Sequence, residues 1–263
     1  MSAPPGPLRS RIAAGERPLG ALLRMPGEEP VEMLGTAGFD FVLIDCEHGP
    51  ADVADLRRHI AAAQVHGMAV LVRVGADEPA LALRALDHGA AGIVVPHVDG
   101  PRDAERAVRA VRHPPLGDRG FATYGRAGGY GTVPAAEHLR RAEADVLLIV
   151  MAESEQGCDR AKEVLAVPGV DGVLVGPADL AVSMGEPGGQ DGPRVRAAVD
   201  RVHREAAAAG RIRMDITGGA PAVRAAYASG ADLVVVNLTR VLMDLFTGLA
   251  SGPRPGGDGA RGR

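Results

Sequence analysis

Short apolar runs alternate with amphipathic stretches along most of the chain. The apolar runs are rich in Val, Ile and Leu, which is typical of parallel strands that are buried on both faces. Eight such runs can be counted, at 19–25 (LGALLRM), 39–46 (FDFVLIDC), 68–74 (MAVLVRV), 91–97 (AGIVVPH), 145–152 (DVLLIVMA), 170–176 (VDGVLVG), 211–216 (RIRMDI) and 232–238 (DLVVVNL). They predict eight strands.

The stretches between these runs carry Ala, Arg and Glu in a helical pattern. Helices are predicted at 51–66, 79–88, 103–112, 158–167, 195–209 and 221–229. Regular alternation of strand and helix implies parallel pairing with right-handed crossovers. Eight repeats without a break in composition favour closure into a barrel over a doubly wound sheet, and the GxGxxG motif of a dinucleotide site is absent. We therefore predict the α/β class and a single (β/α)₈ TIM barrel over 19–250.

Composition agrees with this prediction and narrows the class of partner. The length of 263 residues is close to the roughly 250 that such a barrel needs. A formal charge of −4 with scattered basic residues predicts no nucleic-acid partner. No apolar stretch reaches the roughly 18 residues of a membrane helix, so no membrane partner is expected. Cys46 and Cys158 lie far apart in no metal-binding spacing, which fits a cytoplasmic setting.

Three segments stand outside the repeating pattern. The region 1–18 is an N-terminal segment, and 251–263 (SGPRPGGDGARGR) has nothing to bury and is predicted to be disordered. The connection 113–141, with its glycine-rich 117–132 loop, is too long for a plain crossover. We expect it to border the active site or a subunit contact, and a plain surface insertion is the alternative.

Polar residues that end the apolar runs are the candidates for chemistry, because barrel enzymes place reactive side chains at the carboxyl ends of their strands. In chain order these are Asp45, Glu47, His48, Arg73, His97, Glu153, Gly176, Pro177, Ala178, Asp179 and Asp215. Nothing nearby in the sequence explains His97, so we expect it only to support neighbouring residues of the site. No lysine ends any of the eight runs, so an aldolase that works through a Schiff base is not predicted.

Glu153 and Asp179 follow neighbouring predicted strands, so their carboxylates can converge on one divalent cation. Hard oxygen ligands suit Mg²⁺ or Mn²⁺, and Co²⁺ is a third candidate. The alternative is that Glu153 is solvated and that Asp179 only caps the helix that follows.

His48 and Arg73 are the candidates for moving protons and balancing charge. His48 stands three residues after Asp45, whose carboxylate could orient the imidazole as a general base near neutral pH. The alternative for His48 is ordinary surface hydrogen bonding. Arg73 ends a buried strand and therefore needs an anion, either a structural carboxylate or a bound substrate.

Five strings carry a family resemblance from about Leu19 to about Leu242. They are FDFVLIDCEHGP, VLVRVG, LRALDHGAAGIVVPHVDGPRDAERAV, RHPPLGDRGF and VPGVDGVLVGPADLAVSMG. Together they resemble the HpcH/HpaI aldolases, metal-dependent class II 2-oxo acid aldolases such as those that act on 2-dehydro-3-deoxyglucarate or 4-hydroxy-2-oxoheptanedioate. The resemblance implies a carbon–carbon lyase that works through a pyruvate enolate, with a 2-oxo acid and an aldehyde as its small-molecule partners.

The resemblance also implies roles for single residues. His48 matches the general base, Asp87 the acid that makes this histidine more basic, and Arg73 the group that stabilises the enolate. Glu153 and Asp179 match the metal ligands.

Two further features follow from the resemblance. The backbone N–H groups of Ala178 and Asp179, in the stretch that begins at Gly176 and Pro177, match those that hold the substrate carboxylate. A homo-oligomer is implied, a trimer or a hexamer, with 241–249 (VLMDLFTGL) packed between subunits or, alternatively, against its own barrel floor.

Met151 departs from the family pattern, because many members carry Gln at this position to bind substrate. The departure leaves two alternatives open. One is an enolate-based synthase that resembles a citrate synthase and joins oxaloacetate to an acyl-CoA. The other is an inactive barrel that serves as a binding subunit.

Overall fold

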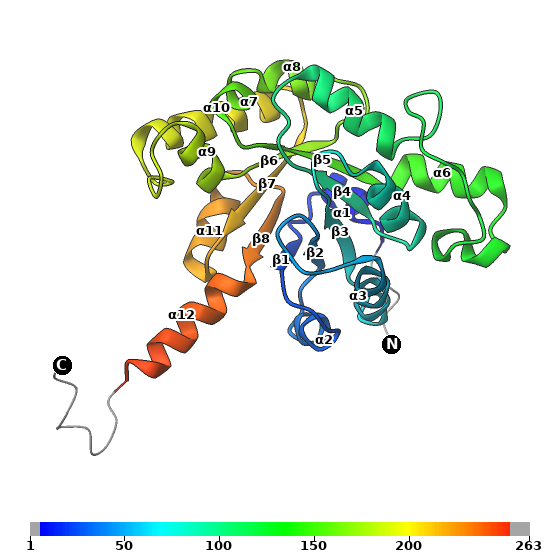
Figure 1. Ribbon diagram of the computed structural model, residues 1–263, viewed down its shortest axis with the longest axis horizontal. Helices are drawn as coiled ribbons and strands as arrows, with labels where there is room; N and C mark the ends of the chain where they lie inside the picture. Colours follow the sequence, from blue (N-terminus) through cyan, green and yellow to red (C-terminus); the bar gives the residue numbers. More distant parts are fainter. Residues whose placement is uncertain (1–5, 253–263) are drawn as a thin grey trace.

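The computed structural model describes residues 6–252, in which eight parallel strands close a barrel (Figure 1). The strands follow one another around the barrel in chain order, and β8 pairs with β1. Their bounds are Leu19–Leu23 (β1), Phe41–Asp45 (β2), Ala69–Arg73 (β3), Gly92–Val95 (β4), Leu147–Ala152 (β5), Gly172–Val175 (β6), Ile212–Thr217 (β7) and Leu233–Asn237 (β8). Seven lie within predicted runs and β7 ends one residue beyond the run 211–216, so the single (β/α)₈ barrel is confirmed.

Helices alternate with the strands. They are α1 (Leu8–Ala13), α2 (Glu29–Thr36), α3 (Val53–Val65), α4 (Pro79–Asp87), α5 (Pro101–Val111), α6 (Ala135–Asp145), α7 (Glu155–Asp159), α8 (Ala161–Leu165), α9 (Pro177–Ser183), α10 (Pro193–Ala208), α11 (Ala220–Ala228) and α12 (Leu238–Ala250), with a 3₁₀ helix η1 at Arg126–Gly131. The helix predicted at 158–167 was wrong in one respect. Two short helices, α7 and α8, occupy this region because the backbone leaves the helical conformation at Arg160.

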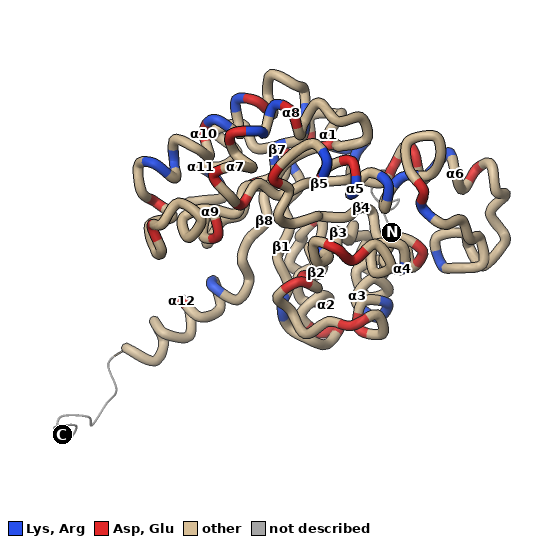
Figure 2. The backbone as a smooth tube through the Cα atoms, turned by 45° about the horizontal axis from the view of Figure 1, so that its top comes forward, with Lys and Arg blue, Asp and Glu red and all other residues tan. Residues whose placement is uncertain are grey.

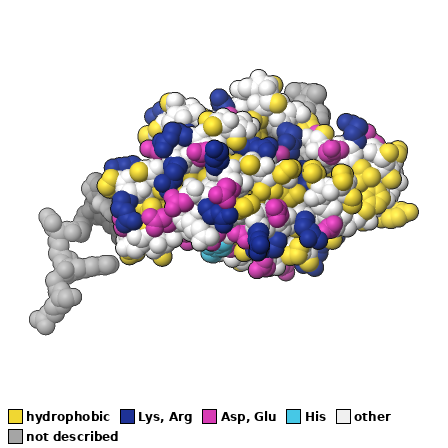
Figure 3. Space-filling model, turned by 90° about the horizontal axis from the view of Figure 1, so that it is seen from above, with side chains coloured by type: hydrophobic (Ala, Val, Ile, Leu, Met, Phe, Trp, Pro, Cys, Tyr) yellow, Lys and Arg dark blue, Asp and Glu magenta, His cyan; other side chains and the backbone are white. Residues whose placement is uncertain are grey.

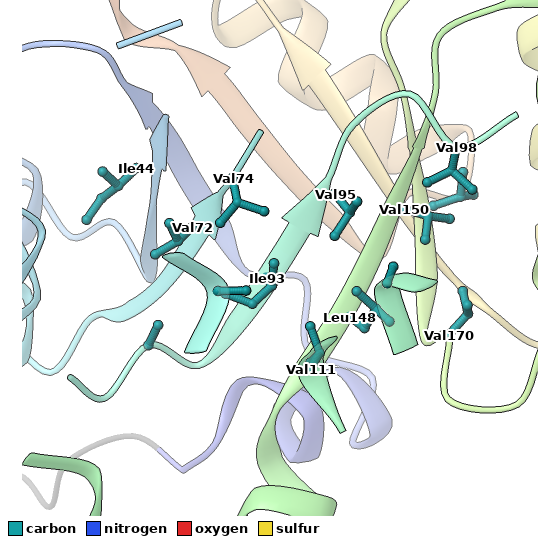
Figure 4. Packing of buried hydrophobic residues seen from close by; sticks show 14 of the residues in the cluster. Ile44, Val72, Val74, Ile93, Val95, Val98, Val111, Leu148, Val150 and Val170 are labelled. Atoms are coloured by element: carbon teal, nitrogen blue, oxygen red, sulfur yellow. The ribbon is translucent and has the colours of Figure 1, made fainter. Parts of the chain in front are cut away.

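The strands separate two apolar layers. Leu43, Leu71 and Ile149 belong to the cluster that fills the barrel interior. Neighbouring residues of the same strands, such as Ile44 and Val72, point outward and pack against the helices (Figure 4). Because side chains alternate along a strand, strands buried on both faces must be apolar at almost every position, which explains the unbroken runs in the sequence.

Helix α1 closes the amino end of the barrel. Leu8 is buried and belongs to the interior cluster, and Ile12 packs against it. Arg9 donates to the backbone oxygen of Val146 (2.6 Å) and pairs with Asp171 (2.7 Å). The predicted N-terminal segment 1–18 is therefore part of the barrel floor where it is described. Residues 1–5, and 253–263 of the predicted disordered tail, lie outside the described residues.

The 113–141 connection lies at the amino end of the barrel, beside α4 and α6. Arg119 bonds to Asp87 at the end of α4, and Phe121 contacts the ring of His138 in α6. None of its residues lines the cavity at the carboxyl ends of the strands. The segment therefore does not border the cavity of its own chain, because α5 has already carried the chain to the opposite end, and the subunit contact that was the other expectation for it stays a prediction.

Two exposed apolar surfaces remain after the barrel is formed. Phe121, Tyr124 and Tyr130 are exposed on the 113–141 connection, and Figure 3 shows hydrophobic side chains gathered at the edge of the molecule on the α6 side. Helix α12 extends away from the barrel, has no buried residue, and is largely without charge (Figures 1 and 2). No helix in the described part of the chain has the length and apolar character to cross a membrane.

Candidate active site

A cavity of about 740 Å³ opens at the carboxyl ends of the strands. Residues from seven strands or the turns that follow them reach it, as the barrel fold predicts. Its lining includes Arg24, Arg73, Met151, Glu153, Gly176, Pro177, Ala178, Asp179 and Arg240. Of the predicted site residues, this cavity brings together Arg73, the predicted metal ligands, and the substrate-binding stretch 176–179.

Asp45 fixes Arg73 at the end of β3. Its two carboxylate oxygens accept from Arg73 Nε (2.9 Å) and Nη2 (2.6 Å), and Oδ2 also accepts from Arg24 Nε (2.5 Å). Burial alone would raise the pKa of Asp45, but the hydrogen bonds from Arg73 and Arg24 outweigh it and lower the pKa to about 2. Asp45 therefore stays ionised and orients the guanidinium, which makes it a support for Arg73 rather than a proton carrier.

The remaining face of Arg73 is directed toward Glu47 and Met151. Nη1 lies 3.2 Å from Glu47 Oε2 and 3.9 Å from Met151 Sδ. The thioether is a weak acceptor, so Met151 holds that nitrogen only weakly and the carboxylate of Glu47 is its nearer partner. A glutamine amide oxygen at this position would compete for it more strongly.

Glu153 follows β5 and is buried, with 4% of its surface exposed. Its Oε2 accepts from the backbone N–H of His97 (3.0 Å), and His97 Nδ1 lies 3.5 Å from the same oxygen. Burial raises the pKa of Glu153, and the carboxylates of Asp179 and Glu47 add to this rise while His97 opposes it. An added cation would relieve this unfavourable environment of the ionised carboxylate.

Oε1 of Glu153 lies on the side of Gly176. A Cβ at Gly176 would stand 2.6 Å from this oxygen, so the glycine keeps the space beside the carboxylate open. Oε1 forms no hydrogen bond within residues 6–252. The oxygen is therefore available to a ligand in the cavity.

Asp179 is in the first turn of α9, which follows β6, the strand next to β5 in the barrel. Its carboxylate is exposed, forms no ion pair or hydrogen bond with the described residues, and acts electrostatically on Glu153. No group of three or more His, Cys, Asp or Glu in the described ranges could hold a metal ion. Two carboxylates beside an open cavity suit a hard divalent cation that takes its other ligands from substrate and water.

The start of α9 also presents backbone donors. Pro177 is the first helical residue, so the N–H groups of Ala178 and Asp179 have no partner within the helix. Both residues line the cavity. Such donors favour a carboxylate.

His48 and Asp87 are not brought together within the chain. His48 is exposed at the rim, outside the cavity lining, with Nε2 3.7 Å from Glu47 Oε2. Asp87 ends α4 near the amino end of the barrel, where its carboxylate accepts from Arg119 Nη2 (3.0 Å). Within one chain, Asp87 therefore has no contact with His48.

The structure gives specific contacts to three further residues of the site, of which Glu47 and His97 were candidates from the sequence and Arg24 was not. Arg24 holds Asp45, Glu47 lies between Arg73 and His97, and His97 contacts both Glu47 (Nε2–Oε1, 3.2 Å) and Glu153. Each stands at or just after a strand end, which was a usable signal. Asp215, also at a strand end, is not in the site, because it pairs with Arg213 instead.

Comparison with known proteins agrees with this geometry. The model of the family described as HpcH/HpaI aldolase/citrate lyase matches residues 23–238. The chain is 36% identical over 200 residues to the pyruvate aldolase of Rhizobium etli, covering 76% of this chain and 78% of the relative. It is 34% identical over 207 residues to the 5-keto-4-deoxy-D-glucarate aldolase of Escherichia coli, covering 79% and 80%.

Solved structures give the same picture. An HpcH/HpaI aldolase/citrate lyase family protein of Burkholderia cenocepacia superposes with a TM-score of 0.84 at 35% identity, covering 92% of this chain and 96% of that one. The citrate synthase SbnG superposes with a TM-score of 0.83 at 26% identity, covering 93% and 96%. The fold is thus shared by aldolases and by at least one synthase.

Proposed function

Because the chain belongs to the HpcH/HpaI aldolase/citrate lyase family, we propose that it cleaves or forms 4-hydroxy-2-oxo acids through a pyruvate enolate with the aid of a divalent cation. Two relatives named as aldolases cover more than three quarters of the chain at 36% and 34% identity. The chain is accordingly a carbon–carbon lyase of the aldolase class.

The proposed chemistry divides between the cation and the residues around it. Glu153 and Asp179 hold the cation, with Mg²⁺, Mn²⁺ and Co²⁺ as candidates. When bound, the cation supplies Lewis-acid polarisation of the keto acid. The N–H groups of Ala178 and Asp179 hold the substrate carboxylate, and the fixed guanidinium of Arg73 balances charge that develops on the enolate oxygen.

His48 carries the proton in this scheme. In the cleavage direction a ring nitrogen of His48 accepts the proton of the 4-hydroxyl group while the bond between carbons 3 and 4 breaks. Cleavage gives an aldehyde and the enolate, and return of the proton from His48 to carbon 3 of the enolate gives pyruvate or a close analogue. Condensation is the reverse reaction.

One observation carries the proposal. Buried Glu153 and unpaired Asp179 line the same cavity as Arg73, so two carboxylates without a cation lie across from a guanidinium that Asp45 has already oriented. A metal-assisted enolate reaction needs both a site for the cation and a cationic group beside the enolate oxygen. Glu153 and Asp179 would provide the first, and Arg73 the second.

The test is turnover of pyruvate with a panel of aldehydes, with Mn²⁺ or Mg²⁺ and then with EDTA. We expect aldol products that disappear with EDTA and return when the metal is restored. Products that persist in EDTA would contradict the proposal.

Variants test the two ligands separately. We expect Glu153→Ala and Asp179→Ala each to lower kcat/KM by at least about a thousandfold, because each removes a direct ligand of the cation. Circular dichroism should show the fold unchanged. Glu163→Ala is the matched control, since Glu163 is on the surface of α8 and, among residues 6–252, its side chain bonds only to Arg160.

A synthase is the second candidate, favoured by the likeness to the citrate synthase SbnG. Turnover of oxaloacetate with acetyl-CoA, compared with pyruvate plus aldehydes, separates the two activities. The inactive barrel remains the third alternative. It would require that calorimetry detect no binding of Mg²⁺, Mn²⁺ or a 2-oxo acid.

We also propose a homo-oligomer, a trimer or a hexamer, in which α12 packs on another copy. Its exposed apolar residues and the separation of Asp87 from His48 within one chain support this proposal. The cytoplasmic location stays a prediction. Cys46 and Cys158 are both free thiols.

A further inference from the structure

His97 lies between two carboxylates at the edge of the candidate metal site. Its backbone N–H (3.0 Å) and its Nδ1 (3.5 Å) both approach Oε2 of Glu153. On the other side of the ring, Nε2 lies 3.2 Å from Oε1 of Glu47. One side chain therefore links the end of β2 to the end of β5.

The backbone of His97 is held in a conformation that its residue type rarely adopts. Its φ is 53°, in the left-handed region that costs energy for a residue with a Cβ. A hydrogen bond holds the turn after β4 against β5, because the N–H of Val98 donates to the backbone oxygen of Met151 (3.1 Å). This conformation directs the N–H and the ring of His97 toward Glu153 together.

The two carboxylate oxygens of Glu153 have different surroundings because of the contact with His97. His97 occupies Oε2, while Oε1 faces the cavity beside Gly176. A carboxylate that could rotate freely would present either oxygen to a cation at an entropic cost. Fixing the orientation before binding removes that cost, which is how residues behind a ligand strengthen metal binding.

We propose that His97 is a positioning residue whose ring Nδ1 and backbone N–H orient Glu153 for the divalent cation. The inference rests on the proposed function. It adds a residue outside the predicted ligand set, and it assigns separate jobs to the two ring nitrogens. Nδ1 acts on the metal ligand, whereas Nε2 holds Glu47, which in turn lies 3.2 Å from Arg73 Nη1.

Three substitutions separate these jobs. His97→Asn places an amide nitrogen close to the position of Nδ1 and tolerates positive φ. His97→Gln places its amide near the position of Nε2 instead. His97→Gly relieves the backbone conformation and removes the ring.

The measurement is calorimetric titration of each protein with Mn²⁺ in the absence of substrate. We expect the Gly and Gln variants to bind Mn²⁺ about 10- to 100-fold more weakly than the parent, the range for residues behind a metal ligand. The Asn variant should stay within about threefold of the parent. At saturating Mn²⁺ the Gly variant should recover most of its kcat, because a positioning residue acts through the metal site.

Controls keep the inference distinguishable from the proposed function. His66→Ala alters an exposed histidine at the end of α3 and should bind Mn²⁺ as the parent does. Equal Mn²⁺ affinity in the parent and the Gly variant, or equal weakening in the Asn and Gly variants, would overturn the inference while leaving the proposed function intact. A parent protein that binds no Mn²⁺ would overturn the proposed function itself.

Discussion

Asp45 shows how one buried charge organises the site at the scale of a residue. It is fully buried, yet it accepts hydrogen bonds from Arg73, Arg24 and the backbone N–H groups of Glu47 and His48. The carboxylate thus fixes both the guanidinium of Arg73 and the backbone that carries His48. Removing it should disturb two proposed catalytic groups at once.

The lowered pKa of Asp45 has a consequence for acid stability. Its folded value, about 2, is below the ordinary value of 3.8, so its contribution is present above about pH 4 and is lost as the pH falls toward 2. A difference of this size corresponds to about 2 kcal/mol of the free energy of unfolding. Urea unfolding between about pH 5 and about pH 2 should show this loss in the parent.

Asp45→Asn supplies the comparison for this pH dependence. The variant should be less stable near neutral pH, because two guanidinium groups lose a buried partner. It should also lose about 2 kcal/mol less than the parent on acidification. Parallel pH curves for the two proteins would mean that Asp45 does not carry the effect.

At the scale of the element, the short helix α1 closes the amino end of the barrel. A helix of 6 residues would not persist alone in water. Here it is held by Leu8 against the barrel interior and by Arg9 against β5 and Asp171. The helix is therefore stable only when it packs on the amino end of the barrel, and the interior cluster at that end is covered only when the helix is in place.

Leu8→Ala should lower the free energy of unfolding by about 2–5 kcal/mol, because it leaves a void under the interior cluster. Urea unfolding near neutral pH measures the change. Leu116→Ala is the matched control. Its side chain is 46% exposed, and the expected change is within about 0.5 kcal/mol. Similar losses in both variants would show that α1 does not seal the barrel.

The strands could be predicted from sequence because burial on both faces leaves an unbroken apolar run. Helix α1 could not, since only Leu8 and Ile12 contribute an apolar face and no periodicity is established over so few residues. The unusual length of the 113–141 connection could be predicted, whereas its position at the amino end of the barrel required the coordinates. Sequence gives the length of a connection more readily than the rim on which it lies.

The candidate site was predictable in part for a similar reason. Arg73, Glu153 and Asp179 lie at or just after the carboxyl ends of β3, β5 and β6, so the fold alone brings them to one rim. The role of His97 depends on a positive φ and on a turn fastened to β5, and neither property can be read from residue types. The distance between Asp87 and His48 likewise required coordinates.

At the scale of the whole molecule, α12 is the helix whose apolar side chains are not buried by the rest of its own chain. Met243, Leu245, Phe246 and Leu249 are each more than half exposed. Exposed apolar groups on one helix that stands away from the barrel are typical of a surface that another chain covers. Figure 1 shows how little of α12 its own barrel contacts.

Phe246→Glu should weaken assembly, because it places a charge in the middle of this apolar surface. Size-exclusion chromatography with light scattering should show a smaller species than the parent at equal concentration. Met33→Glu on α2, also exposed, should leave the mass unchanged. An unchanged mass for the Phe246 variant would argue that α12 is not a subunit contact.

The sealed floor leaves the barrel with one opening, at the rim opposite α1. A molecule bound at the level of Met151 lies farther from this opening than one bound beside Arg240 on α12. After cleavage, the fragment nearer the rim stands in the exit path of the inner fragment. We therefore expect the outer product to leave before the inner one, and product inhibition patterns measured with each product would test this order.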